Sequence, residues 1–277
     1  MEQLIFGKPV ADNLDAESKK IFTNFTLNKR KPKISAITVG ENPASMLYVS
    51  RKQEKADELG VIFDWNKYPA SITQKQLETH INEISYNTDG LIVQLPLPDH
   101  LNPAEVINCI PPEVDVDGLT SVNLGKLFSF NYQIIPATSL AVLEMLKFYS
   151  IETVDKNVVI AGRSRLVSAP LAKILSSKKF NANVTVIHSY TSNQKLFIQN
   201  ADIFISAVGS AKIFDQAYFK KGSTVIDIGI STVDGKTYGD VDPTGLVDYL
   251  SFRAPYPGGV GPVTVSALFY NLAKLIN

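Results

Sequence analysis

Tyr48 and Lys52 are the residues of this 277-residue chain that first suggest chemistry. The Asn-Pro pair at 42–43 predicts a helix start, and Gly60 predicts its end after about Leu59. Side chains four residues apart share a helix face, so a phenol and an ammonium project together. They form either part of a catalytic site or an ordinary solvent-exposed face, because most lysines are exposed.

Three polar side chains downstream also sit at turns. Gln94 interrupts an apolar run and precedes Pro96, which predicts an amide at the carboxyl end of a parallel strand, where open α/β sheets bind ligands. Asp115 and Asp117 precede Gly118, a common turn signal that lacks the further acids of a calcium loop. Each of these features is also explained by local backbone hydrogen bonding alone.

A nucleotide-type turn follows the apolar strand 158–161. Gly162 stands between this strand and a predicted helix, as in a Rossmann phosphate turn, although the G-x-G-x-x-G pattern is not met. The next strand end, 187–191, has no acid for a ribose hydroxyl. Arg163 and Arg165 could hold a 2′-phosphate, which favours NADP over NAD. The alternative is that both arginines face solvent.

The segment 254–262 holds three glycines and three prolines immediately before the last predicted helix. A glycine-rich loop can approach a ligand closely because glycine has no Cβ. A plain structural turn needs fewer of these residues.

Strands alternating with helices predict βαβ units and a parallel sheet in each half of the chain. The irregular stretch 128–137 marks the expected domain boundary. The closing helix could pack back on the first domain, but periodicity does not decide this. Predicted strands cover 33–40, 61–65, 90–94, 158–161, 183–187, 203–207 and 224–228, and predicted helices cover 11–28, 73–84, 138–148, a segment ending near 177, 192–200 and 264–276.

Composition excludes several classes of protein. The 27 basic and 27 acidic residues give zero formal net charge, so neither a nucleic-acid partner nor a disordered acidic tail is predicted. One cysteine and three separated histidines predict no disulfide framework and no metal site. No apolar run reaches the ~18 residues of a membrane span. The start of the chain has no signal-peptide pattern, so a cytoplasmic location is expected.

Taken together, these motifs resemble the bifunctional methylenetetrahydrofolate dehydrogenase/methenyltetrahydrofolate cyclohydrolases. The resemblance spans nearly the whole chain, and its most specific segments are Gln-Leu-Pro-Leu-Pro at 94–98 and Pro-Gly-Gly-Val-Gly-Pro at 257–262. The other matching segments are Tyr48-x-x-x-Lys52, 89–93, 115–119, 162–164 and 188–189.

The resemblance implies a two-domain α/β protein with a folate cleft between an N-terminal αβα catalytic domain and a Rossmann-type NADP-binding domain. The expected boundaries are 1–137 with the helix 262–277 packing back on it, and 138–261. The resemblance further implies NADP-dependent oxidation of 5,10-methylenetetrahydrofolate and hydrolysis of the product to 10-formyltetrahydrofolate. It also implies a role in one-carbon metabolism and purine biosynthesis, and a homodimer.

Site residues are carried over from the family to matching positions. Lys52 is the expected catalytic group, Gln94 its positioning partner, and Tyr48 a folate-site residue. The expected substrate-binding residues are Tyr48, Asp117, Pro257, Gly258 and Gly259. The expected cofactor-binding residues are Gly162, Arg163, Ser164, Ser189, Thr138 and Ile230.

The chain departs from the family at several positions. Residues 136–141 keep only Pro136 and Thr138 of the usual Pro-Cys-Thr-Pro-x-Gly, and Ser168 replaces a usual glycine in the cofactor turn. Three alternatives remain: a monofunctional dehydrogenase, a shikimate- or amino-acid-type dehydrogenase, and a non-catalytic nucleotide-binding module.

Overall fold

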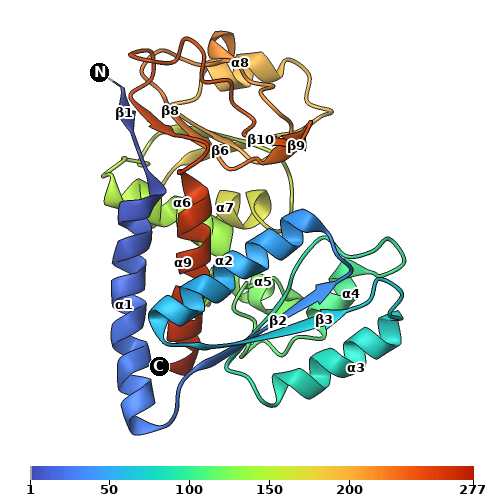
Figure 1. The fold of residues 1–277 in the computed structure, drawn as a ribbon. Coiled ribbons are helices and arrows are strands. Elements are labelled where there is room, and N and C mark those ends of the chain that lie inside the picture. The colour runs from blue at the N-terminus through green and yellow to red at the C-terminus, as the bar shows by residue number, and fades with distance from the viewer. Residues whose placement is uncertain (1) are drawn as a thin grey trace. The chain divides into compact units, whose positions relative to one another are not determined.

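The computed structural model describes residues 2–277 and divides into two compact units (Figure 1). The three-stranded unit comprises Asp12–Ala137 and Val265–Asn277. The six-stranded unit comprises the segment up to Ala11 and Thr138–Thr264. Both contain parallel sheets with helical connections, which confirms the predicted two-domain α/β class.

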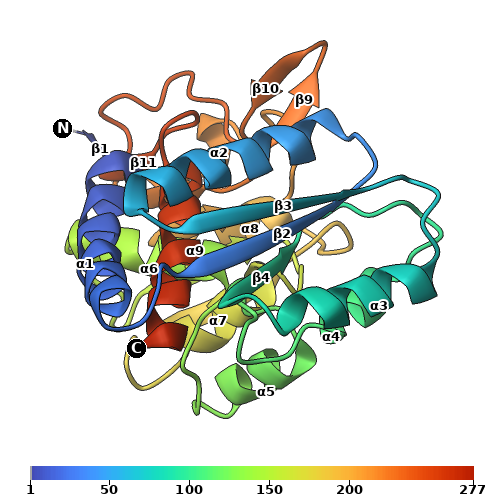
Figure 2. The ribbon, with the colours of Figure 1, turned by 60° about the horizontal axis from the view of Figure 1, so that its bottom comes forward.

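The three-stranded unit is built on a parallel sheet in the order β3-β2-β4, with β2 at Lys33–Val39, β3 at Ile62–Tyr68 and β4 at Gly90–Val93. Helix α2, Pro43–Leu59, connects β2 to β3, and α3, Gln74–Ser85, connects β3 to β4. Figures 1 and 2 show these helices on opposite sides of the strands. The sheet is therefore covered on both faces, as the buried strands β2 and β4 require.

Helix α2 has the boundaries that its sequence predicts. The Asn42 side chain accepts a hydrogen bond from the Ser45 backbone N–H, and Pro43 occupies the first helical position. Gly60 ends the helix in the left-handed conformation, at φ 73°. These local signals fix the rotation of the helix, which points Val49, Lys52 and Ala56 inward.

The six-stranded unit has the parallel order β1-β11-β8-β7-β5-β6. The carboxyl ends of its central strands form one edge, where such sheets bind ligands. Its strands are β1 Gln3–Leu4, β5 Asn157–Ala161, β6 Asn183–Ile187, β7 Ile203–Ser206, β8 Thr224–Asp227 and β11 Phe252–Ala254, and a separate hairpin is formed by β9 Ser231–Val233 and β10 Lys236–Tyr238. Its helices are α6 Ala137–Phe148, α7 Ser168–Leu175, α8 Gln194–Gln199 and the 3₁₀ turn Gln216–Tyr218.

Two long helices belong partly to each unit, α1 at Gly7–Asn28 and α9 at Val260–Ile276, while the short helices α4, Pro103–Asn108, and α5, Ser121–Phe128, lie in the three-stranded unit. Within the three-stranded unit, the buried Asn271 of α9 donates hydrogen bonds to the carbonyls of Val116 (2.9 Å) and Ile135 (2.8 Å). The last turns of the chain therefore pack with residues 12–137.

The expected domain limits differ from the observed units at the N-terminus. We expected residues 1–137 to form one domain, but the Gln3–Leu4 strand pairs in parallel with Phe252 and Arg253 of β11. Arg253 also forms an ion pair with Glu2. A strand of two residues is too short for its pairing to be recognised from alternation of apolar side chains.

Candidate active site

Lys52 lies on the inward face of α2, with only 8% of its surface exposed. Its Nζ donates a hydrogen bond to Oε1 of Gln94, 3.0 Å away. The Gln94 amide nitrogen donates to the carbonyl of Leu95 at 2.9 Å, which leaves the amide oxygen directed at the lysine. Gln94 directly follows β4, so the amide is held by the strand end and the ammonium by the helix.

The charges around Lys52 act against each other. Burial lowers the pKa of Lys52, and the negative charge of Asp117 partly restores it. Burial raises the pKa of Asp117, whereas Lys52 lowers it and Asp115 raises it again. The structure thus brings Lys52, Gln94 and Asp117 into one electrostatic environment.

The two aspartates of the 115–119 segment have different surroundings. The buried carboxylate of Asp115 accepts hydrogen bonds from the backbone N–H groups of Gly118 (2.9 Å) and Thr120 (2.9 Å) and from the Asn123 amide (2.9 Å). Asp115 therefore builds the turn. Asp117, which is half-buried, is the carboxylate that lies close enough to Lys52 to affect its pKa.

Tyr48 lies one helical turn before Lys52 on α2 and is half-buried. This is the shared helix face that the spacing predicts. Its expected contact with folate remains a prediction.

The predicted cofactor turn occupies the carboxyl end of β5. Gly162 has φ 119°, and a Cβ at this position would lie 2.6 Å from the Ala207 carbonyl oxygen, so the turn requires glycine. Ser164 Oγ accepts from the Val167 backbone N–H at 3.2 Å. Ser164 thereby caps the start of α7, whose own N-cap residue, Val167, makes no side-chain capping bond.

Arg163 and the turn after β6 lie together. The Arg163 guanidinium carbon is 5.7 Å from the Tyr190 ring centroid. Tyr190 and Thr191 donate backbone hydrogen bonds to His188, at Nδ1 and at the carbonyl oxygen respectively. β5 and β6 are adjacent strands, so the turn that follows β5 and the turn that follows β6 lie side by side. In a Rossmann unit these two turns contact the pyrophosphate and the ribose, and Ser189 lies in the turn after β6.

The remaining predicted residues lie at other strand and helix ends of the six-stranded unit. Gly258 has φ 98°, its carbonyl accepts from the Gly7 N–H at 2.8 Å, and a Cβ on Gly259 would lie 2.5 Å from the Pro255 carbonyl oxygen. This loop, which includes Pro257, leads into α9. Thr138 lies in the first turn of α6, and Ile230 follows β8.

Comparisons with known proteins assign this arrangement. The sequence profile described as "Tetrahydrofolate dehydrogenase/cyclohydrolase, catalytic domain" matches residues 5–117, and the profile for the family's NAD(P)-binding domain matches residues 136–277. The chain belongs to the tetrahydrofolate dehydrogenase/cyclohydrolase family. The resemblance found in the motifs is confirmed.

Relatives of this family match over nearly the full chain. The bifunctional protein FolD of Lactobacillus acidophilus is 37% identical, over 99% of this chain and 97% of that protein. The structure of FolD from Campylobacter jejuni has a TM-score of 0.94 at 33% identity and covers 100% of this chain and 99% of that one. The Trypanosoma brucei enzyme, solved with NADP cofactor and inhibitor, has a TM-score of 0.93 at 32% identity, covering 99% and 97%.

Ser168 is the departure from the family pattern with the clearest structural consequence. Its side chain is fully buried, and within residues 2–277 its Oγ has no hydrogen-bond partner. A Cβ on Gly162 would lie only 3.0 Å from this oxygen. A second departure, Ser139 on α6, donates to the carbonyl of Val167 at 3.1 Å. Both serines pack around the start of α7 in the cofactor turn.

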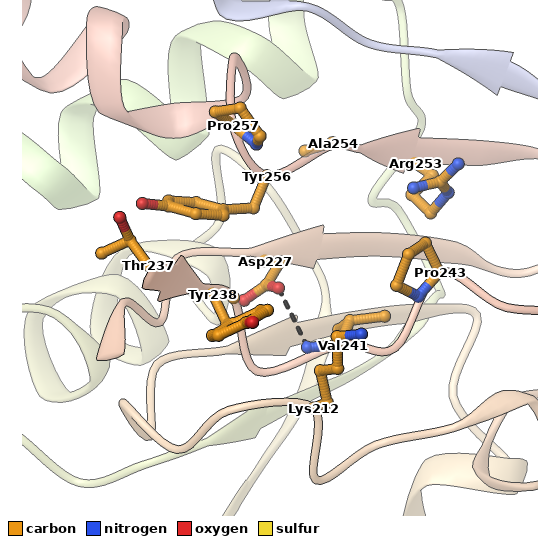
Figure 3. A pocket seen from close by; sticks show the side chains of 11 residues that line it. Lys212, Asp227, Thr237, Tyr238, Val241, Pro243, Arg253, Ala254, Tyr256 and Pro257 are labelled. Atoms are coloured by element: carbon orange, nitrogen blue, oxygen red, sulfur yellow. Dashed lines mark hydrogen bonds between the residues drawn. The ribbon is translucent and has the colours of Figure 1, made fainter. Parts of the chain in front are cut away.

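Sequence reasoning missed a pair of buried aspartates behind the hairpin β9–β10. Asp227 lines a cavity of ≈ 180 Å³ together with Tyr238, Tyr256 and Arg253 (Figure 3). Its carboxylate accepts from the backbone N–H groups of Asp240 and Val241, at 3.1 and 3.0 Å. The available signal was an acid inside the apolar run 224–228.

Within residues 2–277, no group of three or more His, Cys, Asp or Glu side chains is placed to hold a metal ion. Over the same residues, no helix combines the length and the hydropathy needed to cross a bilayer.

Proposed function

We propose that this chain oxidises 5,10-methylenetetrahydrofolate to the 5,10-methenyl form with NADP+ and hydrolyses that product to 10-formyltetrahydrofolate. The observation that carries the proposal is the buried Lys52 held by Gln94 in a chain of this family. A monofunctional dehydrogenase does not need such an ordered, desolvated lysine.

The Lys52 site supplies the proton chemistry of the hydrolysis. Water attack on the methenyl carbon forms a C–O bond and frees a proton from the water. As the C–N bond then breaks, its electron pair stays on the nitrogen, which takes up the second water proton while the C=O bond forms, so that one proton is released overall. Lys52, whose pKa is lowered by burial, exchanges that proton, and Gln94 keeps Nζ in place without adding charge. Asp117 accepts hydrogen bonds from the pterin N–H groups, and Tyr48 lines the folate site.

The six-stranded unit binds NADP+, and the bound cofactor would accept the hydride. The glycine turn at Gly162, which leads from β5 into α7, fits a pyrophosphate near the α7 N-terminus, and Arg163 with Ser189 fits a 2′-phosphate. The absence of an acid after β6 supports NADP over NAD. Pro257, Gly258, Gly259, Thr138 and Ile230 bind the reacting rings.

The test compares both activities in Lys52→Ala. Hydrolysis should fall by about 10²-fold or more, since general acid–base catalysis contributes about 10²–10⁴-fold. NADP+-dependent oxidation should fall much less. Lys55→Ala is the matched control, because Lys55 lies on the same helix but is paired with Asp15 and Glu58. Equal losses of both activities in Lys52→Ala would contradict the assigned role.

We also propose a cytoplasmic homodimer that acts in one-carbon metabolism and supplies purine biosynthesis. The edge strand β6 of the six-stranded unit, with Val186 39% exposed, is the surface we propose for the dimer. Light scattering of Val186→Lys should show a monomer, whereas an unchanged mass would exclude this edge.

A further inference from the structure

Asp240 is a fully buried carboxylate that joins three segments of the six-stranded unit. Its Oδ2 accepts from the Ser206 hydroxyl at 2.6 Å and from the Val208 N–H at 2.8 Å. Its Oδ1 accepts from the Ser210 N–H at 2.8 Å. Both oxygens of this buried side chain therefore have hydrogen-bond partners in residues 206–210.

The segment held by Asp240 lies against the cofactor turn. Residues 206–210 continue β7, and the Ala207 N–H donates to the Ala161 carbonyl at 2.8 Å. The Ala207 carbonyl oxygen is the atom that a Cβ on Gly162 would approach to 2.6 Å. A shift of this segment would therefore change the space beside Gly162.

The loop after β8 packs directly against the Asp240 carboxylate. A Cβ on Gly229 would lie 2.0 Å from the Asp240 carboxyl group, so only glycine fits there. The N–H groups of Ile228 and Gly229 donate to the Ser206 carbonyl, which ties this loop to the end of β7. Asp240 thus contacts the carboxyl ends of two neighbouring strands at the ligand-binding edge of the sheet.

Asp227 in turn holds the backbone of Asp240. Its two carboxylate oxygens accept from the N–H groups of Asp240 and Val241, and Figure 3 shows the bond to Val241. A Cβ on Gly239 would lie 2.1 Å from Asp227 Oδ2, so only glycine fits beside this carboxylate. The two aspartates therefore form one buried, hydrogen-bonded unit.

We propose that Asp240 is a positioning residue for the dinucleotide: its carboxylate fixes residues 206–210 against Gly162 and thereby sets the affinity for NADP. This inference rests on the proposed function, because it names the cofactor site of that reaction. Asp240 acts through the backbone it holds, and not on the folate or on Lys52.

The test uses Asp240→Asn, which keeps the shape but turns an acceptor into an NH₂ group facing a backbone N–H. We expect the Kd for NADP+, measured by calorimetry, and the KM for NADP+ to rise about tenfold, since one buried donor loses its partner. Hydrolysis of methenyltetrahydrofolate should stay within about twofold, because the Lys52 site lies in the other unit. Asp242→Asn is the control, because the side chain of Asp242 accepts its hydrogen bonds from the nearby Thr244 and not from residues 206–210.

Ser206→Ala is the second variant, in case Asp240→Asn does not fold. It removes one hydroxyl donor and should raise the Kd in the same direction by a smaller factor. An unchanged Kd for NADP+ in either folded variant would overturn the proposal, as would an equal loss of hydrolysis and oxidation. Because the Kd is measured without turnover, failure of the proposed function, seen as a wild-type chain with neither activity, is distinguishable from failure of this inference.

Discussion

Nζ of Lys52 donates to Oε1 of Gln94 at 3.0 Å, while the nitrogen of the same amide donates to the Leu95 carbonyl. The amide therefore has one orientation, and its oxygen faces the ammonium. A neutral partner orders the lysine without the strong increase in pKa that a carboxylate would cause. This is the arrangement expected where a lysine must release a proton during the reaction.

Gln94→Glu tests that arrangement by adding one charge. An anion at this distance should raise the pKa of Lys52, against the lowering that burial causes. We expect the limb of the pH profile of hydrolysis that reports Lys52 to move to higher pH, by about one unit or more. Gln199→Glu, an exposed change in the other unit, is the control. A profile that stays in place would show that Gln94 does not set the proton affinity of Lys52.

Local signals predicted the position of Lys52 but not its environment. The Asn-Pro start at 42–43 and the glycine at 60 fix α2 from sequence, because capping depends on neighbouring residues only. The bond to Gln94 depends on how α2 and β4 pack, so it came from the family resemblance. Dependence on tertiary packing also explains why the sequence does not place Gln3–Leu4 in the six-stranded unit. The partner strand of these residues is more than 200 residues away (Gln3 with Phe252).

The buried aspartates illustrate a second limit. The hydrogen bonds that join Asp227 to residues 240 and 241 are donated by backbone N–H groups, which no pattern of side chains reveals. Asp115 and Asp117 show the reverse case. The sequence of their segment allows both a turn and a functional site. The structure shows that Asp115 builds the turn, while Asp117 lies near Lys52.

Ser168→Ala should stabilise the protein. The buried Oγ has no partner within residues 2–277, and an unsatisfied buried polar group costs about 1–3 kcal/mol. Removing the oxygen should raise the free energy of unfolding by about 1 kcal/mol and Tm by about 2–4 °C. Ser139→Ala is the matched contrast, since it deletes the bond to Val167 and should lower both quantities. A lower Tm for Ser168→Ala would mean that its hydroxyl is satisfied.

Asp227→Asn should remove a pH dependence of stability. Burial, reinforced by the charge of Asp240, raises the pKa of Asp227 from 3.8 to about 7 despite the hydrogen bonds that it accepts. Between these values the native state keeps a proton that the unfolded state has released. Stability from this group is therefore complete below about pH 4 and is lost as the pH rises through about 7, on the order of a few kcal/mol.

The measurement for Asp227 is urea unfolding of both proteins at about pH 5 and about pH 8. The variant should gain stability relative to wild type as the pH rises, and the difference should level off above the native pKa. Parallel curves would contradict the raised pKa. Asp240, Lys212, Arg253, Tyr238 and Tyr256 also line or adjoin the cavity at Asp227, so only the difference between the two proteins is informative.

Arg163→Ala should change the choice of cofactor. A 2′-phosphate gains charge-assisted hydrogen bonds from a guanidinium, and NAD+ has no such group. The KM for NADP+ should rise by about tenfold or more, while the KM for NAD+ should change little. Tyr190→Phe is the control because it keeps the ring 5.7 Å from the guanidinium carbon and removes only the hydroxyl. If both cofactors weaken equally in Arg163→Ala, the arginine holds the pyrophosphate, and the preference for NADP then rests on the turn at Ser189.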